Sequence, residues 1–295
     1  MNEFNWILPE YKEERIEAYM SNQIPMFQPP SEWLPPESIP NLSDAKEIAV
    51  DLETRDEKIK ELGPGWATGE GDVIGVAVAV EGWKGYFPLK HPGGGNFDEK
   101  IFYRNFKKLM ALPNRKIFHN AMYDVGWLKQ KDIQVNGNYI DTMIAAQIID
   151  ENRMGYSLNA VAKDYLGEKK NENLLYEAAK EWGVDPKGEM FKLPAQFVGP
   201  YAEQDADLTL RLWHRLESEI YKQDLVSVFS LETNILPALI EMKWRGVRVN
   251  TSRATQIKEN LLEEENALLT KIKSISGVSV DVWAARSVAK AFDAM

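Results

Sequence analysis

The stretch Ile48-Ala49-Val50-Asp51-Leu52-Glu53-Thr54 places two carboxylates among apolar residues. Its short apolar run predicts a buried strand with an acidic end. Side chains two positions apart in a strand point to the same face, so Asp51 and Glu53 would lie side by side. Neighbouring like charges repel, but carboxylate oxygens are the ligands that hard divalent cations take. Because Asp-x-Glu also occurs at solvated strand ends, a metal site requires further acids elsewhere in the chain.

The composition is that of a globular protein without disulfide bonds. The 295 residues are 44% hydrophobic and 27% charged, and none is Cys, which excludes a disulfide framework and thiolate chemistry and fits a reducing compartment. We find no membrane-spanning apolar run and no signal peptide, and expect a cytoplasmic protein. The net charge of −10 argues against nucleic-acid binding. That argument is weak, because an enzyme that meets phosphates through metal ions can be acidic overall.

Residues 1–46 are predicted to form a Pro-rich N-terminal extension. A short polar helix is expected from Glu10 to Met20, and six prolines then prevent regular structure: Pro25, Pro29, Pro30, Pro35, Pro36 and Pro40. Phe27 and Trp33 would pin this segment to the main domain as an ordered arm. The alternative is a ligand for a proline-recognising partner.

The pattern after residue 46 predicts an α/β domain. A strand at 47–52 and a hairpin of 73–80 and 83–89, turning at Glu81-Gly82, come first. The glycine-rich 61–69 is predicted to be a loop without an element, either a plain connection or a flexible flap over a site. Strands at 115–118 and 139–140 then alternate with helices. The predicted helices are 97–112 with Asn96 in a capping box, 120–131, one opening at Asp141, one from Ser157 to Gly167, 173–182, and 200–221 with Pro200 in its first turn. We expect a hairpin at one sheet edge and parallel strands at the other.

Two further motifs carry acids. His119-Asn120-Ala121-Met122-Tyr123-Asp124 follows a predicted strand, and Tyr201-Ala202-Glu203-Gln204-Asp205-Ala206-Asp207 lies on a predicted helix. Each motif contains two residues four positions apart, which share one face of a helix: Asn120 with Asp124, and Tyr201 with Asp205. Asp207 lies off the face of Asp205 and is expected to be structural.

The three motifs, in this order, resemble the tyrosine-type DEDD exonuclease superfamily. The resemblance is to the 3′–5′ proofreading exonuclease domain of family A DNA polymerases and covers residues 47–222. It extends to Asp141-Thr142-Met143, Ser157-Leu158 and Tyr165-Leu166-Gly167, while the loop at 61–71 resembles the bacteriophage branch. It implies a ribonuclease H-like mixed sheet flanked by helices.

The resemblance also implies a mechanism with two divalent cations, Mg²⁺ or Mn²⁺, about 3.5–4 Å apart. Asp51 would bridge the ions, Glu53 and Asp205 would complete the first site, and Asp124 would support the second. Tyr201 would orient the attacking water, because an ordinary tyrosine pKa near 10 makes a poor base at neutral pH.

The expected substrate is a single-stranded or frayed 3′ DNA end. By the same resemblance, Thr54, His119, Asn120 and Tyr123 match positions that touch the terminal nucleotides. His119 stands where the bacterial enzymes of this family have a glutamine. Tyr176 is a candidate to stack on the strand or, equally, an ordinary helix residue.

Residues 223–295 are predicted to be helical. Segments 232–237 and 242–250 resemble the opening of the polymerase thumb, which continues in that family into the palm and fingers. The chain stops at Met295 before residues that could form a polymerase site, so we expect it to hydrolyse DNA without extending a primer. Its amphipathic helices would meet a separate polymerase part or a second copy, or fold back on the exonuclease domain.

Two other functions fit the same motifs. A ribonuclease D-like enzyme that trims RNA shares all three, but the thumb-like segment argues against it. An inactive domain that only binds DNA or braces a split polymerase is the second, and the presence of all four carboxylates argues against it. If the protein is phage-encoded, its location would be the host cytoplasm.

Overall fold

The computed structural model describes residues 28–137 and 139–295. The described elements are β1 (Glu47–Arg55), α2 (Ile59–Leu62), α3 (Gly65–Thr68), β2 (Asp72–Val80), β3 (Trp83–Pro88), α4 (Glu99–Met110), β4 (Arg115–Phe118), α5 (Ala121–Gln130), β5 (Tyr139–Asp141), α6 (Thr142–Ile149), α7 (Leu158–Leu166), α8 (Asn173–Trp182), the 3-10 helix η1 (Met190–Lys192), α9 (Ala195–Lys222), α10 (Val226–Arg245), α11 (Thr251–Ser276) and α12 (Ala285–Asp293).

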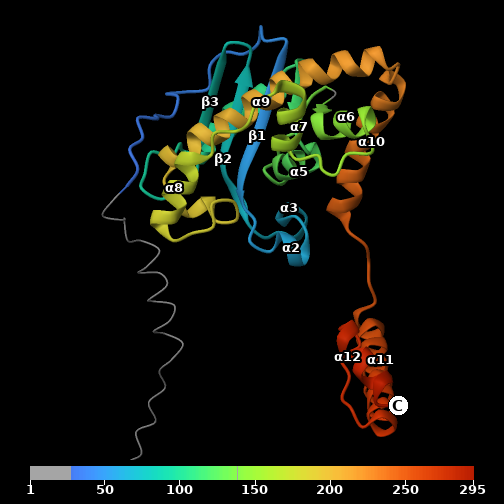
Figure 1. Ribbon diagram of the computed structural model, residues 1–295. Coiled ribbons are helices and arrows are strands. Elements are labelled where there is room, and N and C mark those ends of the chain that lie inside the picture. Colours follow the sequence, from blue (N-terminus) through green and yellow to red (C-terminus); the bar gives the residue numbers. More distant parts are fainter. Residues whose placement is uncertain (1–27, 138) are drawn as a thin grey trace, which may run out of the picture. The chain divides into compact units, whose positions relative to one another are not determined.

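The five strands form one mixed sheet in the order β3-β2-β1-β4-β5 (Figure 1). β2 pairs antiparallel with β1 and β3, and β4 pairs parallel with β1 and β5. The hairpin edge and the parallel edge are both as predicted. The α/β fold class is therefore confirmed.

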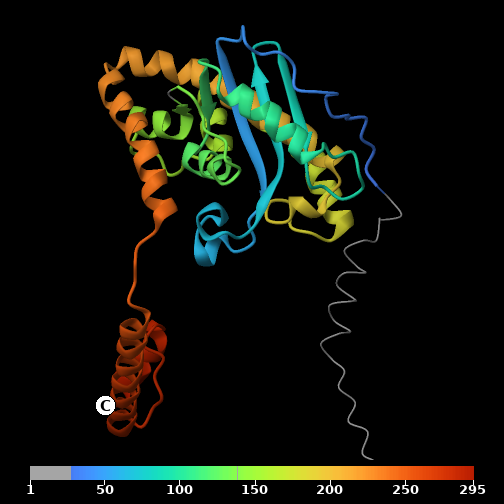
Figure 2. The same ribbon diagram turned by 180° about the vertical axis from the view of Figure 1, so that it is seen from behind.

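Strand β1 is buried on both faces, because its side chains pack into a separate hydrophobic cluster on each face of the sheet. Ile48, Val50 and Leu52 pack in a cluster with residues of α4 and α5, while Ala49, two positions before Asp51, packs in a cluster with residues of α9. The long helix α9 crosses one face of the sheet (Figure 1), and α4 lies on the other (Figure 2). The alternation of β1 thus directs Asp51 and Glu53 toward α9.

The prediction of a loop without an element at 61–69 is wrong, because this stretch contains the short helix α3 and the last two residues of the equally short α2. Trp66 of α3 is buried against α5, where a Cβ on Gly126 would lie 2.1 Å from the Trp66 ring. The burial of one tryptophan therefore gives order to a segment whose glycines favour irregular backbone.

Two helix starts also differ from the predictions. Helix α4 is capped by Asp98, which accepts from the Ile101 amide, while the Asn96 side chain pairs with both backbone groups of His91. Helix α9 begins at Ala195, so Pro200 lies inside it and not in its first turn. Pro200 cannot donate to the carbonyl of Gln196, and the Ser31 hydroxyl donates to that carbonyl at 2.9 Å.

The N-terminal arm, from residue 28 onward, lies against the domain as predicted. The Trp33 indole donates to Glu203 of α9 at 2.9 Å, and its ring lies where a Cβ on Gly199 would be. The predicted helix at Glu10–Met20 and the predicted contact of Phe27 lie outside the described residues.

The chain divides into two compact units after Arg245. Helix α10 belongs to the first unit, because Leu236 and Ile240 are buried in the same core as α4 and α5. In the second unit, α11 and α12 contact each other. Within the described ranges, no helix is both long and apolar enough to cross a membrane.

Candidate active site

Three carboxylates from two elements converge on the α9 face of the sheet. Asp51 and Glu53 come from β1 and Asp205 from α9, and one oxygen from each lies within 4.8 Å of the others. Glu53 and Asp205 are buried, and Asp51 is partly exposed. The sequence motifs at 51–53 and 201–205 thus meet at one point.

A fourth carboxylate, Asp124, reaches the cluster through the backbone of β1. The pairing of β1 with β4 extends only to Ala49 opposite Ile117, so the Leu52 amide is free of the ladder. It donates to Oδ1 of Asp124 at 3.0 Å. Leu52 stands between Asp51 and Glu53, which brings the second motif beside the first.

The turn from β4 into α5 aims Asp124 at this point. Asn120 has a left-handed backbone (φ 71°), a conformation that Asn tolerates better than most residues. The amides of Asn120 and Ala121 donate to the Asp141 carboxylate at 2.9 and 2.8 Å. Asp141 also caps α6 through the Met143 amide, so its predicted N-cap role is confirmed.

Burial and mutual repulsion weaken the acidity of these carboxyls. Desolvation, followed by the charge of Asp205, raises the pKa of Asp51 to about 7. Burial likewise raises the pKa of Glu53, Asp124 and Asp205, with the charge of Asp51 adding to the effect at Glu53 and Asp124. Without a bound cation, the folded protein therefore favours the protonated forms of these carboxyls.

The donor set fits a hard divalent cation. Oδ1 of Asp205 is buried and has no hydrogen-bond partner in the part of the chain that the structure describes. A buried carboxylate oxygen without a partner is costly, and a bound cation would satisfy it. Carboxylate oxygens in this number suit Mg²⁺ or Mn²⁺ better than the softer metals.

Tyr201 lies beside the carboxylates with only 8% of its surface exposed. Its hydroxyl accepts a hydrogen bond of 3.0 Å from Nζ of Lys187. Burial, followed by the negative charges of Asp205, Glu53 and Asp51, raises the pKa of Tyr201 far above its usual range. The hydroxyl therefore keeps its proton and can orient a neighbouring group, but it cannot serve as a base.

Comparison with known proteins shows the family of this chain. The model of the 3′–5′ exonuclease family, in the form found in family A DNA polymerases, matches residues 34–221. The chain belongs to this 3′–5′ exonuclease family. It is 36% identical to a DNA-directed DNA polymerase of Pseudomonas phage M6 over 90% of this chain and 43% of that protein. It is 28% identical to the DNA polymerase I of Pseudomonas aeruginosa over 80% of this chain and 25% of that protein. The chain therefore spans less than half the length of these curated relatives.

A solved structure supports the fold of the exonuclease domain. Brucella melitensis NrnC with bound Mg²⁺ superposes with a TM-score of 0.51 at 18% identity, covering 72% of this chain and 94% of that one. This likeness confirms the predicted ribonuclease H-like architecture.

Two lysines of the exonuclease domain reach the cluster and were not anticipated. Lys170 binds Asp205 through Nζ at 2.5 Å, and Lys187 lies 4.2 Å from the centroid of the Tyr201 ring. Both come from loops that flank α8, where lysines read as ordinary surface residues. The signal available in the sequence was indirect: a cluster of four acids, most of them buried, requires nearby positive charge.

Tyr86 was also missed and forms a wall of the site. Its hydroxyl lies over Gly75, the β2 partner of Glu53, where a Cβ would come within 2.0 Å. The hydroxyl pairs with Nε2 of His91 at 2.6 Å, and burial lowers the pKa of His91 to about 4. A glycine opposite an acidic strand position was the available clue.

The candidate nucleotide contacts fall into two groups. Thr54 and Tyr123 are brought together, since their hydroxyls lie 2.7 Å apart and Tyr123 donates to Asp56 at 3.0 Å. Asn120 is exposed at the start of α5, and Tyr176 is 46% exposed on α8. These side chains are accessible or directly connected to the acidic strand.

His119 is used inside the protein. Its Nδ1 pairs with the Thr142 hydroxyl at 2.8 Å and its Nε2 with the Tyr156 carbonyl at 2.9 Å. Burial lowers the pKa of His119 to about 4, so the ring is neutral at pH 7. The residue ties β4 to α6 and to the chain before α7.

Asp207 does not join the cluster, as expected from its helical position. Its carboxylate pairs with Arg211, four residues later, at 3.2 Å. It also lies 3.8 Å from Nζ of Lys84 on β3. Asp207 therefore fastens α9 to the hairpin edge.

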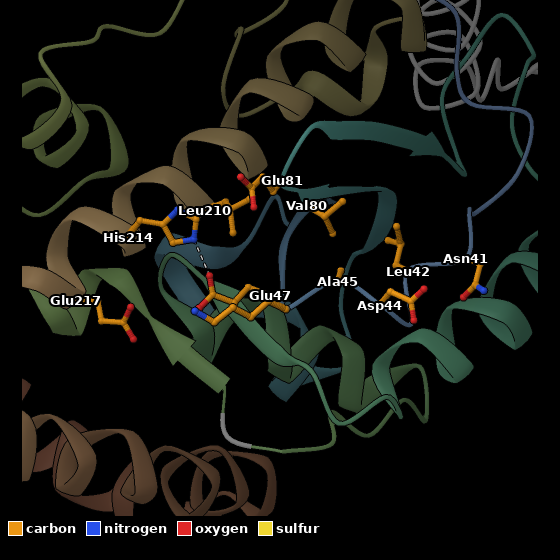
Figure 3. A pocket seen from close by; sticks show the side chains of 11 residues that line it. Asn41, Leu42, Asp44, Ala45, Glu47, Val80, Glu81, Leu210, His214 and Glu217 are labelled. Atoms are coloured by element: carbon orange, nitrogen blue, oxygen red, sulfur yellow. Dashed lines mark hydrogen bonds and ion pairs between the residues drawn. The ribbon is translucent and has the colours of Figure 1, made fainter.

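A cavity of about 820 Å³ lies at the other end of β1 (Figure 3). Glu47 at its floor accepts from Nε2 of His214 at 2.6 Å and pairs with Arg115. Glu47 stands four residues before Asp51, about 13 Å along the strand. The cavity is therefore separate from the carboxylates.

Proposed function

We propose that this chain is a metal-dependent 3′–5′ exonuclease that removes nucleoside monophosphates from DNA ends. The observation that carries the proposal is the convergence of oxygens from Asp51, Glu53 and Asp205 within 4.8 Å, with Asp124 on the adjacent backbone. Membership of the 3′–5′ exonuclease family supports the reaction, and the polymerase names of its relatives support DNA as the substrate.

The four carboxylates divide into two groups around Asp51. One oxygen each of Glu53, Asp205 and Asp51 lie within 4.8 Å of one another, and the charge of Asp51 also raises the pKa of Asp124. We assign Asp51, Glu53 and Asp205 to one Mg²⁺ or Mn²⁺ and Asp51 with Asp124 to a second. When bound, such ions stabilise the negative charge that develops on the attacking and leaving oxygens of a phosphodiester.

Tyr201 positions the attacking water in this mechanism. Lys187 donates to its oxygen, so the hydroxyl can donate its own proton to a neighbouring acceptor. Because the hydroxyl stays protonated, its contribution is orientation, and the water loses its proton to another acceptor.

Four side chains are proposed to hold the 3′ end. Thr54 and Tyr123 would contact the terminal nucleotide next to the acidic strand, with Asn120 on the exposed start of α5. Tyr176 offers an exposed aromatic face, which suits stacking on any base. We assign His119 a structural part, because both ring nitrogens already bind protein groups.

We further propose that the activity serves proofreading. A site that grips single-stranded nucleotides should favour ends that are already unpaired, since unpairing costs a few kcal/mol. The test is single-turnover digestion of 5′-labelled primers with matched and mismatched 3′ ends in Mg²⁺, beside an RNA oligonucleotide of the same sequence. Faster loss of the mismatched DNA end is expected. Faster digestion of the matched end contradicts proofreading, and preference for RNA favours the ribonuclease alternative.

We also propose that the helices after residue 222 contact a separate polymerase part or a second copy of this chain. Helix α10 already buries Leu236 and Ile240 in the exonuclease unit. In the second unit, α11 exposes Leu261, Leu262 and Leu268. Sedimentation of the full chain tests self-association through this second unit.

A further inference from the structure

Lys170 is part of the acidic cluster itself. It lies in the loop between α7 and α8, with its Nζ 2.5 Å from Oδ2 of Asp205, and both side chains are only 7% exposed. Its Nζ is also 3.4 Å from the Tyr201 hydroxyl and 4.9 Å from the centre of that ring. An ammonium enclosed to this degree balances buried carboxylates and differs from ordinary surface ion pairs.

This ammonium competes with a divalent cation for the same group. Asp205 offers two oxygens, of which Oδ2 holds Lys170 and Oδ1 has no partner among the described residues. An ion on Oδ1 would face the ammonium across one carboxylate, and repulsion between cations at this range greatly exceeds thermal energy in a protein interior. The two cations therefore compete for the charge of Asp205, and departure of the lysine would relieve their repulsion.

We propose that Lys170 is an exchangeable internal cation, which holds Asp205 in the metal-free protein and leaves it when a divalent cation binds. The inference rests on the proposed function in taking the cluster as the metal site. The long, unbranched side chain and its position in a loop allow the ammonium to move away without a change in β1 or α9.

Lys187 provides an internal comparison. It is 40% exposed, and its carboxylate partner is Glu172, at 2.6 Å, which lies outside the cluster. Lys187 therefore contributes positive charge near the site without occupying a carboxylate of the cluster. A comparison of the two lysines therefore distinguishes direct binding to a carboxylate of the cluster from the effect of positive charge nearby.

Calorimetric titration of the full chain with Mn²⁺ tests the exchange. Lys170→Met should bind Mn²⁺ about 10-fold to 100-fold more tightly than wild type, the range that corresponds to a hydrogen bond with a charged group. Lys187→Met should change the affinity by less than about 5-fold, as for a partly exposed pair. Lys192→Met is the matched control, because Lys192 pairs with Glu189 at the surface and should leave the affinity unchanged.

Thermal melts of the same proteins give a second readout. Loss of Lys170 leaves the buried acids without their cation, so Lys170→Met should melt at a lower temperature than wild type in EDTA. Saturating Mn²⁺ should also raise the melting temperature of Lys170→Met by more than that of wild type, because tighter binding stabilises the native state more.

Amine footprinting of the wild-type protein covers the case in which Lys170→Met fails to fold. Acetylation of Lys170, measured by mass spectrometry, should be slow in EDTA and should rise several-fold in saturating Mn²⁺, while acetylation of Lys192 stays constant. Lys170 that remains protected while Mn²⁺ binds overturns the inference, as does an unchanged or weaker affinity of a folded Lys170→Met protein. A wild-type chain that binds no Mn²⁺ overturns the proposed metal site as well, so the two failures are distinguishable.

Discussion

The amide of Leu52 donates a hydrogen bond of 3.0 Å to Oδ1 of Asp124. This contact joins two motifs that are 72 residues apart and holds α5 beside the acidic end of β1. It is available because β1 leaves its parallel partner β4 after Ala49. The same divergence that ends the ladder thus admits the fourth carboxylate to the cluster.

The carboxylates are expected to matter for activity and not for folding. Asp51→Asn should reduce exonuclease activity to background, while the metal-free protein gains about 1–2 kcal/mol in free energy of unfolding, because one of several crowded buried charges is removed. Oligonucleotide digestion and urea denaturation in EDTA measure both effects. Asp207→Asn on α9 is the control and should remain active. A folded Asp51→Asn enzyme with full activity in Mg²⁺ contradicts the site assignment.

Metal-free stability should fall as the pH rises. The pKa of Asp51 is about 7 in the folded protein against an ordinary 3.8, so folding favours its protonated form. This contribution is fully present below pH 3.8 and is lost as the pH passes 7. Because Asp51 is partly exposed, we expect wild type to lose about 1–3 kcal/mol relative to Asp51→Asn between pH 5 and pH 8.

Urea denaturation in EDTA at both pH values measures that difference. Saturating Mn²⁺ should reverse the trend, because a metal ion binds deprotonated carboxylates. If wild type and Asp51→Asn show parallel pH dependence in EDTA, Asp51 does not titrate with a raised pKa.

Tyr201→Phe should slow the exonuclease without abolishing it. Loss of one positioned donor in a preorganised site reduces the rate by up to about 10²–10³-fold. The pH dependence of the single-turnover rate should keep its shape, because the hydroxyl does not ionise. An unchanged rate would show that Tyr201 takes no part in the mechanism. If the pH profile of the variant lost the change in rate that wild type shows at high pH, Tyr201 would instead take part in proton transfer.

The contact between Trp66 and Gly126 should hold the α3 segment in place. A Cβ at Gly126 would lie 2.1 Å from the Trp66 ring, so Gly126→Ala should lower the free energy of unfolding by about 1–3 kcal/mol. Gly155→Ala is the matched control: nothing lies within 4 Å of its added Cβ, and stability should change little. Equal stability of the two variants in urea would mean that α3 does not pack firmly on α5.

The regular parts of this fold could be predicted from local pattern. The hairpin follows from two apolar runs around Glu81-Gly82, and α7 from the Ser157 cap and the glycine at its end. The spacing of Asp51 with Glu53 and of Tyr201 with Asp205 correctly indicated shared faces, since both periods are fixed by backbone geometry.

The remainder depends on tertiary contacts that no local pattern contains. Pro200 tolerates a helix interior because Ser31, 165 residues away, satisfies the Gln196 carbonyl. Trp66 orders a glycine-rich segment only because Gly126 leaves space for its ring. Lys170 belongs to the site through a loop position, where periodicity gives no direction for a side chain.

The most direct measurement is anomalous diffraction from a crystal of this chain soaked in Mn²⁺. We predict an anomalous peak at about 2.0–2.3 Å from carboxylate oxygens of Asp51, Glu53 and Asp205, the usual range for a hard divalent ion. A saturating soak that leaves this cluster without an anomalous peak would contradict the assignment of these residues as the metal site of a 3′–5′ exonuclease.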